Sequence, residues 1–235
     1  MDRLDQSNPR IPARGHLVPT GPVDALDWYY RRGIRVVMRS RLAWARDALI
    51  THKADGVLEI GYGSGIFQYE LSHRARMSVG IDIHASASVV RDCLTHDGVE
   101  SVLVRADGCA LPFADRSFDA AVIVSALEFV FDPEACLREC LRVLRDDGLL
   151  ICVSPRELAW ADRILQWLVG VRPEDEFRSG RERAQKALEA VLPDAHRATR
   201  PGCLSGWLAP YVLVVREGPS PGHPARRRDG RPRDH

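Results

Sequence analysis

The chain has 235 residues, and its 33 basic and 32 acidic residues leave a formal net charge of +1 at pH 7. Because this balance creates no strong field of one sign, it disfavours nucleic acid or an anionic membrane as the main partner and favours a small-molecule substrate. A chain of this length can bury one α/β core without disulfides or a metal.

The two ends of the chain differ in composition from the rest. Residues 1–22 and 218–235 are rich in Pro, Gly and Arg and lack apolar periodicity, which predicts two disordered segments around a folded part at 23–217. The first twenty residues hold five charged residues and three prolines, where a secretory signal needs an apolar run. No stretch approaches the roughly 20 uninterrupted apolar residues of a membrane-spanning helix, so we expect a cytoplasmic protein with no integral membrane segment.

The segment 23–50 repeats apolar residues at helical spacing, including Leu26, Val37 and Trp44, with arginines between them. This pattern predicts an amphipathic lead-in helix that is interrupted at Gly33. Five short apolar runs follow, at 56–60, 78–83, 101–104, 120–124 and 149–153. Because these runs lack polar alternation, they favour strands covered on both faces, and therefore a doubly wound, mostly parallel sheet.

The second half of the chain carries clear helix signals. Asp132 is a predicted N-cap, Pro133 the first helical residue, and Gly148 the residue just past the helix end. Two helices are predicted at 158–171 and 179–192, the second opened by the capping box Ser179 to Glu182. A final strand is predicted at 211–216. We expect the lead-in helix at 23–50 and the helical insert 156–200 to select the substrate, because segments beyond the strand ends vary function on a shared scaffold.

Six cysteines are present without a Cys-x-x-Cys pair, and most of them lie in apolar runs. They are interpreted as reduced core residues. Cys136 and Cys140 lie four residues apart on a predicted helix, but no nearby His or Cys completes four zinc ligands, so no metal is predicted.

The strongest functional motif is the loop Glu59-Ile-Gly-Tyr-Gly-Ser-Gly65, between a strand and a helix. Glycines there allow a sharp turn and a close approach of the backbone to a ligand. Ile66 stands where a dinucleotide-binding loop would have its third glycine, which disfavours NAD or FAD. Glu59 would repel a pyrophosphate and attract an ammonium or sulfonium, so the ligand is expected to carry positive charge. Asp82, at the end of the second strand, could bind ribose hydroxyls.

Five motifs in order resemble the class I S-adenosylmethionine-dependent methyltransferases, in particular the quinone-biosynthesis and other small-molecule enzymes. They lie at 59–65, 80–83, 106–119, 127–130 and 142–148. The resemblance implies an α/β fold with a doubly wound, mostly parallel seven-stranded Rossmann-like sheet, an antiparallel last strand and helical caps. It also implies S-adenosyl-L-methionine as cofactor, a small-molecule methyl acceptor and a core at 56–155. We expect a monomer or a homodimer.

The resemblance assigns roles to individual residues. Glu59 and the loop residues Gly61, Tyr62, Gly63 and Gly65 would surround the methionine part of the cofactor. Asp82 would bind the ribose, Ile83 would pack on adenine, and Asp107 would accept a hydrogen bond from the adenine amino group, with Gly108 and Cys109 supplying nearby backbone. Ser125 would line the channel where cofactor and acceptor meet. The implied cofactor-binding residues are Glu59, Gly61, Tyr62, Gly63, Gly65, Asp82, Ile83, Asp107, Gly108, Cys109 and Ser125.

Two departures from the family pattern bear on the chemistry. Tyr62 replaces a small residue, so its ring could crowd the methionine moiety or donate a hydrogen bond to it. Phe129 stands where many relatives carry a histidine, which removes an obvious general base and suggests an apolar wall. No catalytic residue is assigned, although a proton could be accepted by Tyr30, Glu128 or His196.

Other interpretations remain open at this point. The chain could hold the cofactor without turnover as a binding module, or act at a membrane surface on a lipid-like acceptor. A nicotinamide-dependent oxidoreductase is also considered, although Ile66 and Glu59 argue against it. The remaining histidines with a possible role, His73, His84 and His96, are interpreted as surface residues.

Overall fold

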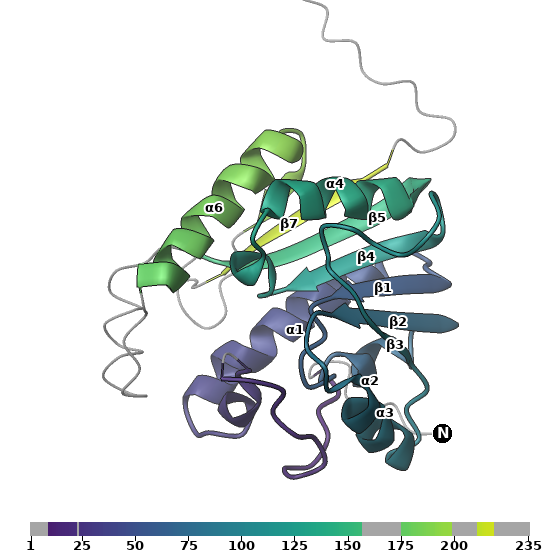
Figure 1. The fold of residues 1–235 in the computed structure, drawn as a ribbon, viewed down its shortest axis with the longest axis vertical. Helices are drawn as coiled ribbons and strands as arrows, with labels where there is room; N and C mark the ends of the chain where they lie inside the picture. Colours follow the sequence, from purple (N-terminus) through teal and green to yellow (C-terminus); the bar gives the residue numbers. More distant parts are fainter. Residues whose placement is uncertain (1–8, 23, 157–174, 199–210, 219–235) are drawn as a thin grey trace, which may run out of the picture.

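A computed structural model describes residues 9–22, 24–156, 175–198 and 211–218. Within these ranges the chain forms a seven-stranded sheet with the order β3-β2-β1-β4-β5-β7-β6 (Figure 1). The strands are β1 (Gly56–Ile60), β2 (Met77–Asp82), β3 (Val102–Arg105), β4 (Phe118–Val124), β5 (Leu144–Pro155), β6 (His196–Ala198) and β7 (Tyr211–Glu217).

The strand directions confirm the expected fold class. β1 to β5 pair in parallel, and β7 runs antiparallel to both of its neighbours, β5 and β6. β6 is therefore parallel to β5, and the last strand in the chain is the antiparallel one. The sequence did not reveal β6, because its three residues are polar or small and no apolar run marks them.

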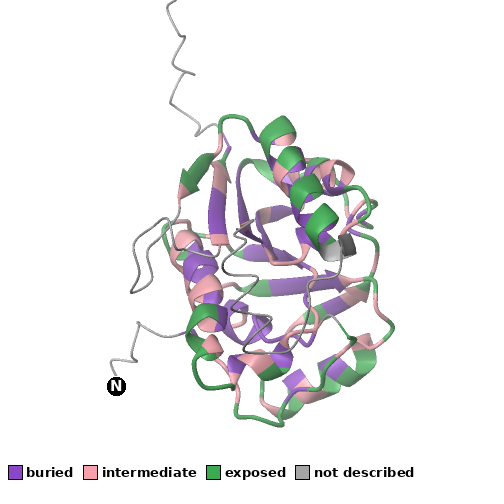
Figure 2. Ribbon diagram, turned by 90° about the vertical axis from the view of Figure 1, so that its left-hand side faces the viewer, coloured by how far each residue is buried: buried purple, intermediate pink, exposed green. Residues whose placement is uncertain are grey.

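Alternate residues of β1, β4, β5 and β7 belong to two separate hydrophobic clusters. Val57 of β1 packs with α1 (Ile34–Ile50), α2 (Gln68–Leu71) and α3 (Ala87–His96), whereas its neighbour Leu58 packs with α4 (Pro133–Val143) and α6 (Asp175–Val191). Figure 1 shows these two helix groups on opposite faces of the sheet, and Figure 2 shows the buried strands between them. The unbroken apolar runs follow from this two-sided burial.

The lead-in helix is interrupted at Gly33, as predicted. A 3-10 helix, η1 (Leu26–Tyr29), precedes α1, and Gly33 takes a positive φ of 85° between them. A residue without a Cβ reaches this conformation at low cost. The turn sends α1 back across the sheet, where it packs on β4, β5 and β7.

The helix α4 begins as predicted and ends earlier. The Asp132 side chain accepts a hydrogen bond from the Ala135 N–H, and Pro133 occupies the first turn. The helix ends at Val143, however, and the predicted role of Gly148 as the residue past the helix end is wrong. Gly148 lies within β5, where its carbonyl accepts a hydrogen bond from Gly218. Pairing with the neighbouring strand overrides the local stop signal.

The capping box at Ser179 is also wrong, because α6 begins at Asp175 and Ser179 lies inside it. Acidic residues at 175 and 176 suit a helix start, since they complement the partial positive charge there. The predicted helix at 158–171 lies outside the described residues.

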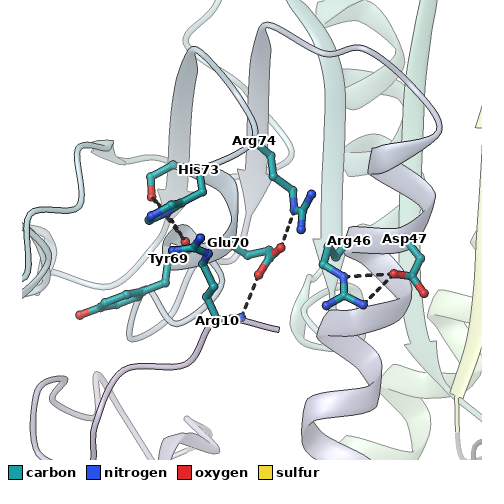
Figure 3. Close-up of polar contacts among 8 residues, drawn as sticks. Arg10, Arg46, Asp47, Tyr69, Glu70, His73 and Arg74 are labelled. Atoms are coloured by element: carbon teal, nitrogen blue, oxygen red, sulfur yellow. Dashed lines mark hydrogen bonds and ion pairs between the residues drawn. The ribbon is translucent and has the colours of Figure 1, made fainter. Parts of the chain in front are cut away.

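Residues 9–22 pack on the domain, which corrects the expectation of disorder for that part of the segment. The Arg10 N–H donates to Glu70, which also pairs with Arg74, as Figure 3 shows beside the Arg46–Asp47 pair of α1. Leu17 is buried, and this long-range contact supplies the stability that local periodicity does not. Residues 1–8 and 219–235 lie outside the description.

The described cysteines are unpaired thiols, and Cys136, Cys140 and Cys152 are buried in the second hydrophobic cluster. Cys203 lies outside the described residues. Among the helices within the described ranges, none combines the length and the apolar character needed to cross a membrane.

Candidate active site

The order of the strands reverses between β1 and β4, which are neighbours in the sheet although β2 and β3 lie between them in the chain. At such a switch point the connections from adjacent carboxyl ends run in opposite directions and leave room for a ligand. The glycine loop follows β1 at this point, and residues 125–130 follow β4. The sequence motifs therefore meet at one edge of the sheet.

The glycine loop has a backbone that requires glycine. Gly61, Gly63 and Gly65 take positive φ angles of 76°, 51° and 80°. A Cβ on Gly61 would overlap the side chain of Ala126, and the Gly61 N–H donates to the Ile81 carbonyl at 2.8 Å. At Gly61 the loop therefore contacts both the end of β2 and the residues after β4. Because glycine has no side chain, the loop backbone can come close to a ligand there.

Glu59 is a buried carboxylate at the end of β1, with 3% of its surface exposed. Its partner is the Gln68 side-chain amide, whose oxygen accepts from Ser101 Oγ at 2.6 Å. Burial raises the pKa of Glu59 to about 8, with a smaller increase from the charge of Asp82, against the lowering effect of Gln68. No cation pairs with Glu59 among the described residues. A buried carboxyl without a counter-ion favours a cationic ligand group.

Asp82 fixes the loop from the neighbouring strand. Its Oδ2 accepts from the Gly63 N–H at 2.8 Å and its Oδ1 from the His84 N–H at 3.3 Å. A carboxylate has about four acceptor positions, so it can still bind ribose hydroxyls.

His84 is not the surface residue expected from the sequence. Its Nδ1 accepts from the Ser86 N–H at 3.1 Å, which leaves Nε2 protonated to donate to the Gly63 carbonyl at 3.0 Å. The ring therefore braces the glycine loop. Only the folded chain shows this role, because the two partners are 21 positions apart.

The Tyr62 ring is buried in the first hydrophobic cluster, with 2% of its surface exposed. It packs edge to face against His84, with ring centroids 5.0 Å apart, and it lies against Gly80, where a Cβ would come within 2.9 Å of the ring. Its hydroxyl has no hydrogen-bond partner among the described residues, and burial raises its pKa to about 12. The structure thus places the ring in the core beneath the loop.

The residues expected to hold adenine follow β2 and β3. Ile83 is 69% exposed, a large apolar side chain open to a flat ligand. Asp107 is exposed, and its Oδ1 accepts from the Cys109 N–H at 2.9 Å. Gly108 packs closely, since a Cβ there would lie 3.3 Å from Ile60. The Cys109 thiol donates to the Asp132 carbonyl, and burial raises its pKa to about 11, so it is a neutral thiol and a poor nucleophile.

Ser125 follows β4 directly and takes a positive φ of 51°. Its N–H donates to the Val153 carbonyl at 2.8 Å, and its buried Oγ has no hydrogen-bond partner among the described residues. Strained backbone with an unsatisfied polar atom is common at binding sites. Ser125 precedes Ala126, whose side chain lies against Gly61, so Ser125 and the glycine loop share one edge of the sheet.

The three candidate proton acceptors occupy different places. Glu128 lies in the 3-10 helix η2 (Leu127–Phe129), just after β4, and is buried. The Tyr30 hydroxyl donates to the Pro12 carbonyl and holds the N-terminal segment. His196 is exposed on β6, at the edge of the sheet, with β7, β5 and β4 between it and β1. Of these three, Glu128 lies just after β4, near Ser125 and Ala126.

Sequence reasoning missed Arg41, Tyr29 and Arg181, which lie near Glu128. Arg41 donates to the Tyr29 hydroxyl at 3.0 and 2.6 Å, and both arginines lower the pKa of Glu128 against the effect of burial. No local signal distinguishes Arg41 from the other arginines of its helix, because its role depends on partners far away in the chain.

A comparison with protein families matches residues 58–152 to the family described as "Methyltransferase domain". These residues include the glycine loop, Asp82, Asp107 and Ser125. The chain is also 30% identical over 138 residues to the ubiquinone/menaquinone biosynthesis C-methyltransferase UbiE of Bartonella tribocorum, covering 55% of this chain and 52% of that protein. Residues 58–152 are thus similar to the class I S-adenosylmethionine-dependent methyltransferases.

Other similarities agree with this family. An uncharacterized protein of Mycobacterium tuberculosis is 36% identical over 170 residues, which cover 72% of this chain and 55% of the relative. The chain thus spans about half the length of the curated relatives it matches. The crystal structure of the N-methyltransferase NodS from Bradyrhizobium japonicum, in complex with S-adenosyl-L-homocysteine, superposes with a TM-score of 0.57 at 18% identity, covering 77% of this chain and 86% of NodS. This likeness supports the methyltransferase fold.

Proposed function

We propose that the chain transfers a methyl group from S-adenosyl-L-methionine to a small apolar or aromatic acceptor. The observation that carries this proposal is the buried Glu59 carboxyl, two residues before the glycine loop, which has no cationic partner among the described residues. The ammonium or sulfonium of the cofactor would supply the missing positive charge. The buried Ser125 hydroxyl, which has no hydrogen-bond partner among the described residues, could also contact this ligand.

In this proposal, different residues of the site bind different parts of the cofactor. The loop at 61–65 and Glu59 hold the methionine part, with Tyr62 supporting the loop from below. Asp82 accepts from the ribose hydroxyls, and the exposed Ile83 covers one face of adenine. Asp107 accepts from the adenine amino group, because an ionised carboxylate is a strong acceptor for that donor. The remaining walls of the proposed cofactor site are formed by Gly108, Cys109 and Ser125.

When bound, S-adenosylmethionine supplies a methyl group already activated on a positively charged sulfur. The protein has to hold the acceptor atom in line with that group and exclude water. Such positioning can lower the barrier by roughly 7 to 11 kcal/mol. The glycine loop lies between the ends of β2 and β4, which both pair with β1 inside the sheet. A loop held by two paired strands can keep the cofactor in a fixed position relative to the acceptor.

Two features support an apolar or aromatic acceptor. Phe129 and Phe131 follow β4 at the same edge of the sheet, and both are exposed. The relatives named above include a ubiquinone/menaquinone biosynthesis C-methyltransferase, which takes part in the synthesis of quinones. The net charge of +1 does not favour a nucleic acid as the acceptor.

Calorimetric titration tests the proposal with S-adenosylmethionine, S-adenosylhomocysteine and NAD on the full chain. We expect both sulfur nucleosides to bind, and at 100 times the dissociation constant to stabilise the fold by about 2.7 kcal/mol. NAD should have no effect. Saturable methylation of candidate phenols, quinones and amines by radiolabelled cofactor completes the test. Binding without any turnover would instead identify a cofactor-binding module, and absence of binding would refute the proposal.

A further inference from the structure

A second polar group lies beside the cofactor site and is not needed to hold the cofactor. It consists of Tyr29, Arg41, Glu128, Arg181 and Tyr211, which we call the Arg41 cluster. Glu128 follows β4 by way of Ser125, and Tyr211 pairs with Pro155 at the carboxyl end of β5. The cluster therefore lies at the sheet edge where a methyl acceptor would approach Ser125.

Arg41 is a partly buried cation held by aromatic residues. Its Nε and Nη2 donate to the Tyr29 hydroxyl, and its guanidinium carbon lies 5.1 Å from the centre of the Tyr29 ring and 6.0 Å from that of Tyr211. Arg41 forms no ion pair among the described residues. A cation that is fixed by neutral groups keeps its charge available for an anionic ligand.

Glu128 is an unsatisfied carboxyl close to this cation. It is 4% exposed, and its Oε2 has no hydrogen-bond partner among the described residues. Arg41 and Glu128 lie within each other's electrostatic field, yet no direct hydrogen bond joins them. A buried carboxyl oxygen without a hydrogen-bond partner is costly, which favours a ligand that donates to it.

The position of Glu128 is set by a close contact with α6. A Cβ on Gly180 would overlap the Glu128 carbonyl oxygen, so the helix approaches η2 as closely as a backbone allows. Glycine inside a helix costs about 1 kcal/mol relative to alanine, so its presence there agrees with a need for close approach. Arg181, the next residue, is buried beside Glu128.

We propose that the Arg41 cluster binds the methyl acceptor through an acidic hydroxyl group, a phenol or an enol, with Arg41 holding the oxygen and Glu128 accepting its proton. This inference rests on the proposed methyltransferase function and specifies its acceptor. The acceptor nucleophile, either that oxygen or the ring or enol carbon conjugated with it, attacks the methyl carbon. Its new bond to carbon forms while the carbon–sulfur bond breaks, the hydroxyl proton moves to Glu128, and sulfur leaves as a neutral thioether.

The two charges of the cluster discriminate among acceptors. A carboxylate acceptor arrives already charged and would be repelled by ionised Glu128, while a protonated amine would be repelled by Arg41 and Arg181. A hydroxyl arrives neutral and becomes negative only after its proton has left. Burial raises the pKa of Glu128 to about 7, opposed by Arg41 and Arg181, and a base near neutrality is well matched to this transfer. The other titratable group in its field is the buried Cys152 thiol.

The test uses pairs of compounds that share one skeleton and differ in a hydroxyl or an amine. Suitable pairs are 4-nitrophenol with 4-nitroaniline and 1-naphthol with 1-naphthylamine. Each compound is titrated into the full chain saturated with S-adenosylhomocysteine, so no turnover is needed. We expect the hydroxyl member of at least one pair to bind at least tenfold more tightly, and its absorbance to show the anionic form below its free pKa.

Variants then separate the two roles. Arg41→Gln should weaken hydroxyl binding at least tenfold, whereas Arg41→Lys should restore part of it and Arg138→Gln, an exposed arginine on α4, should change nothing. Glu128→Gln should retain binding but lose the ionisation of the bound hydroxyl, and it should remove the step near pH 7 from the binding profile. Glu134→Gln, an exposed carboxylate, is its control. The affinity for S-adenosylhomocysteine and the melting temperature are measured for every variant.

The outcomes distinguish the acceptor site from the cofactor site. If S-adenosylhomocysteine binds but no hydroxyl compound binds better than its amine partner, the acceptor inference is wrong and the proposed function survives. Equal hydroxyl binding by the parent and folded Arg41→Gln also overturns it. Should Arg41→Gln fail to fold, the paired titrations on the parent still decide the matter.

Discussion

The two halves of the site are assembled in different ways. The cofactor half contains Glu59, the glycine loop, Asp82 and Asp107, which follow three neighbouring parallel strands within about fifty residues of chain. The acceptor half, the Arg41 cluster, draws on η1, α1, η2, α6 and β7, which lie far apart in the sequence.

This difference determines how a substitution in each half affects ligand binding. The cofactor half depends on backbone conformation, since three glycines at positive φ and the Gly63 N–H set its shape. The acceptor half depends on side chains carried by separate helices, so a substitution there can alter the acceptor without moving the loop. Changes in one half should therefore leave the other half's ligand affinity largely intact, and the following predictions test that separation.

The largest effect is expected for Gly61→Ala. A left-handed conformation costs a residue with a Cβ about 1–2 kcal/mol, and overlap with Ala126 adds about 1–3 kcal/mol. We expect a loss of about 2–5 kcal/mol in unfolding free energy and no measurable binding of S-adenosylhomocysteine by calorimetry. Gly98→Ala is the matched control, because Gly98 has a φ of 72° and no atoms near its missing Cβ. If both substitutions lowered the unfolding free energy equally, backbone strain at a positive φ would account for the whole loss, and the predicted overlap with Ala126 would be wrong.

The next largest effect is the pH dependence of cofactor binding, which we attribute to Glu59. Because its folded-state pKa is about 8 and its ordinary value is 4.5, the ligand-free protein holds this carboxyl protonated at neutral pH. Stability from this group is therefore greatest below about 4.5 and declines as the pH rises toward about 8. A cationic ligand favours the ionised form, so cofactor binding should release a proton and tighten with pH, by at most about tenfold per pH unit.

Glu59→Gln should abolish this dependence and weaken binding by roughly 1.5–3 kcal/mol, the usual worth of a charged hydrogen bond. Calorimetry in buffers of different ionisation enthalpy measures the released proton. Glu134→Gln should keep the parental profile, since Glu134 lies exposed on α4 and forms a surface ion pair with Arg138. Unchanged proton release in Glu59→Gln would show that another group titrates.

A smaller change is expected for Gly180→Ala, in the acceptor half. Alanine normally stabilises a helix interior by about 1 kcal/mol over glycine, but here its Cβ would overlap the Glu128 carbonyl. We expect a net destabilisation of about 1–2 kcal/mol in denaturant unfolding, with lost acceptor binding and parental affinity for S-adenosylhomocysteine. Ser179→Ala, at an exposed neighbouring position, serves as the control. A stabilised Gly180→Ala would contradict the close approach of α6 to η2.

The smallest effect should come from Ile83→Ala. The side chain is 69% exposed, so its loss should leave the melting temperature unchanged while removing apolar contact with adenine. We expect S-adenosylhomocysteine to bind about 1 kcal/mol more weakly, near the free energy of a buried methylene or two. Val102→Ala, another exposed apolar residue on the edge strand β3, should not alter binding. Unaltered affinity in Ile83→Ala would place adenine elsewhere.

Much of the cofactor half was predictable from the sequence. The apolar runs located β1 to β5 and β7, and the glycine spacing with Glu59 and Asp82 located the loop, because these signals act over a few residues. The predicted helix end before Gly148 and the predicted capping box at Ser179 were wrong, because both rested on local signals. Strand pairing and packing with distant residues outweighed a local preference of about 1 kcal/mol. His84 was misjudged because its partner lies in another loop.

The sequence by itself determined the order of strands and helices, the strand ends that carry polar residues and the charge expected of the ligand. These follow from local periodicity, backbone requirements of glycine and the fixed charge of carboxylates. Only the tertiary structure decided that Arg41, Glu128 and Gly180 meet, that Tyr62 turns into the core and that residues 9–22 pack on the domain. Such contacts join positions many residues apart, and their free energy appears only when the sheet has brought those positions together.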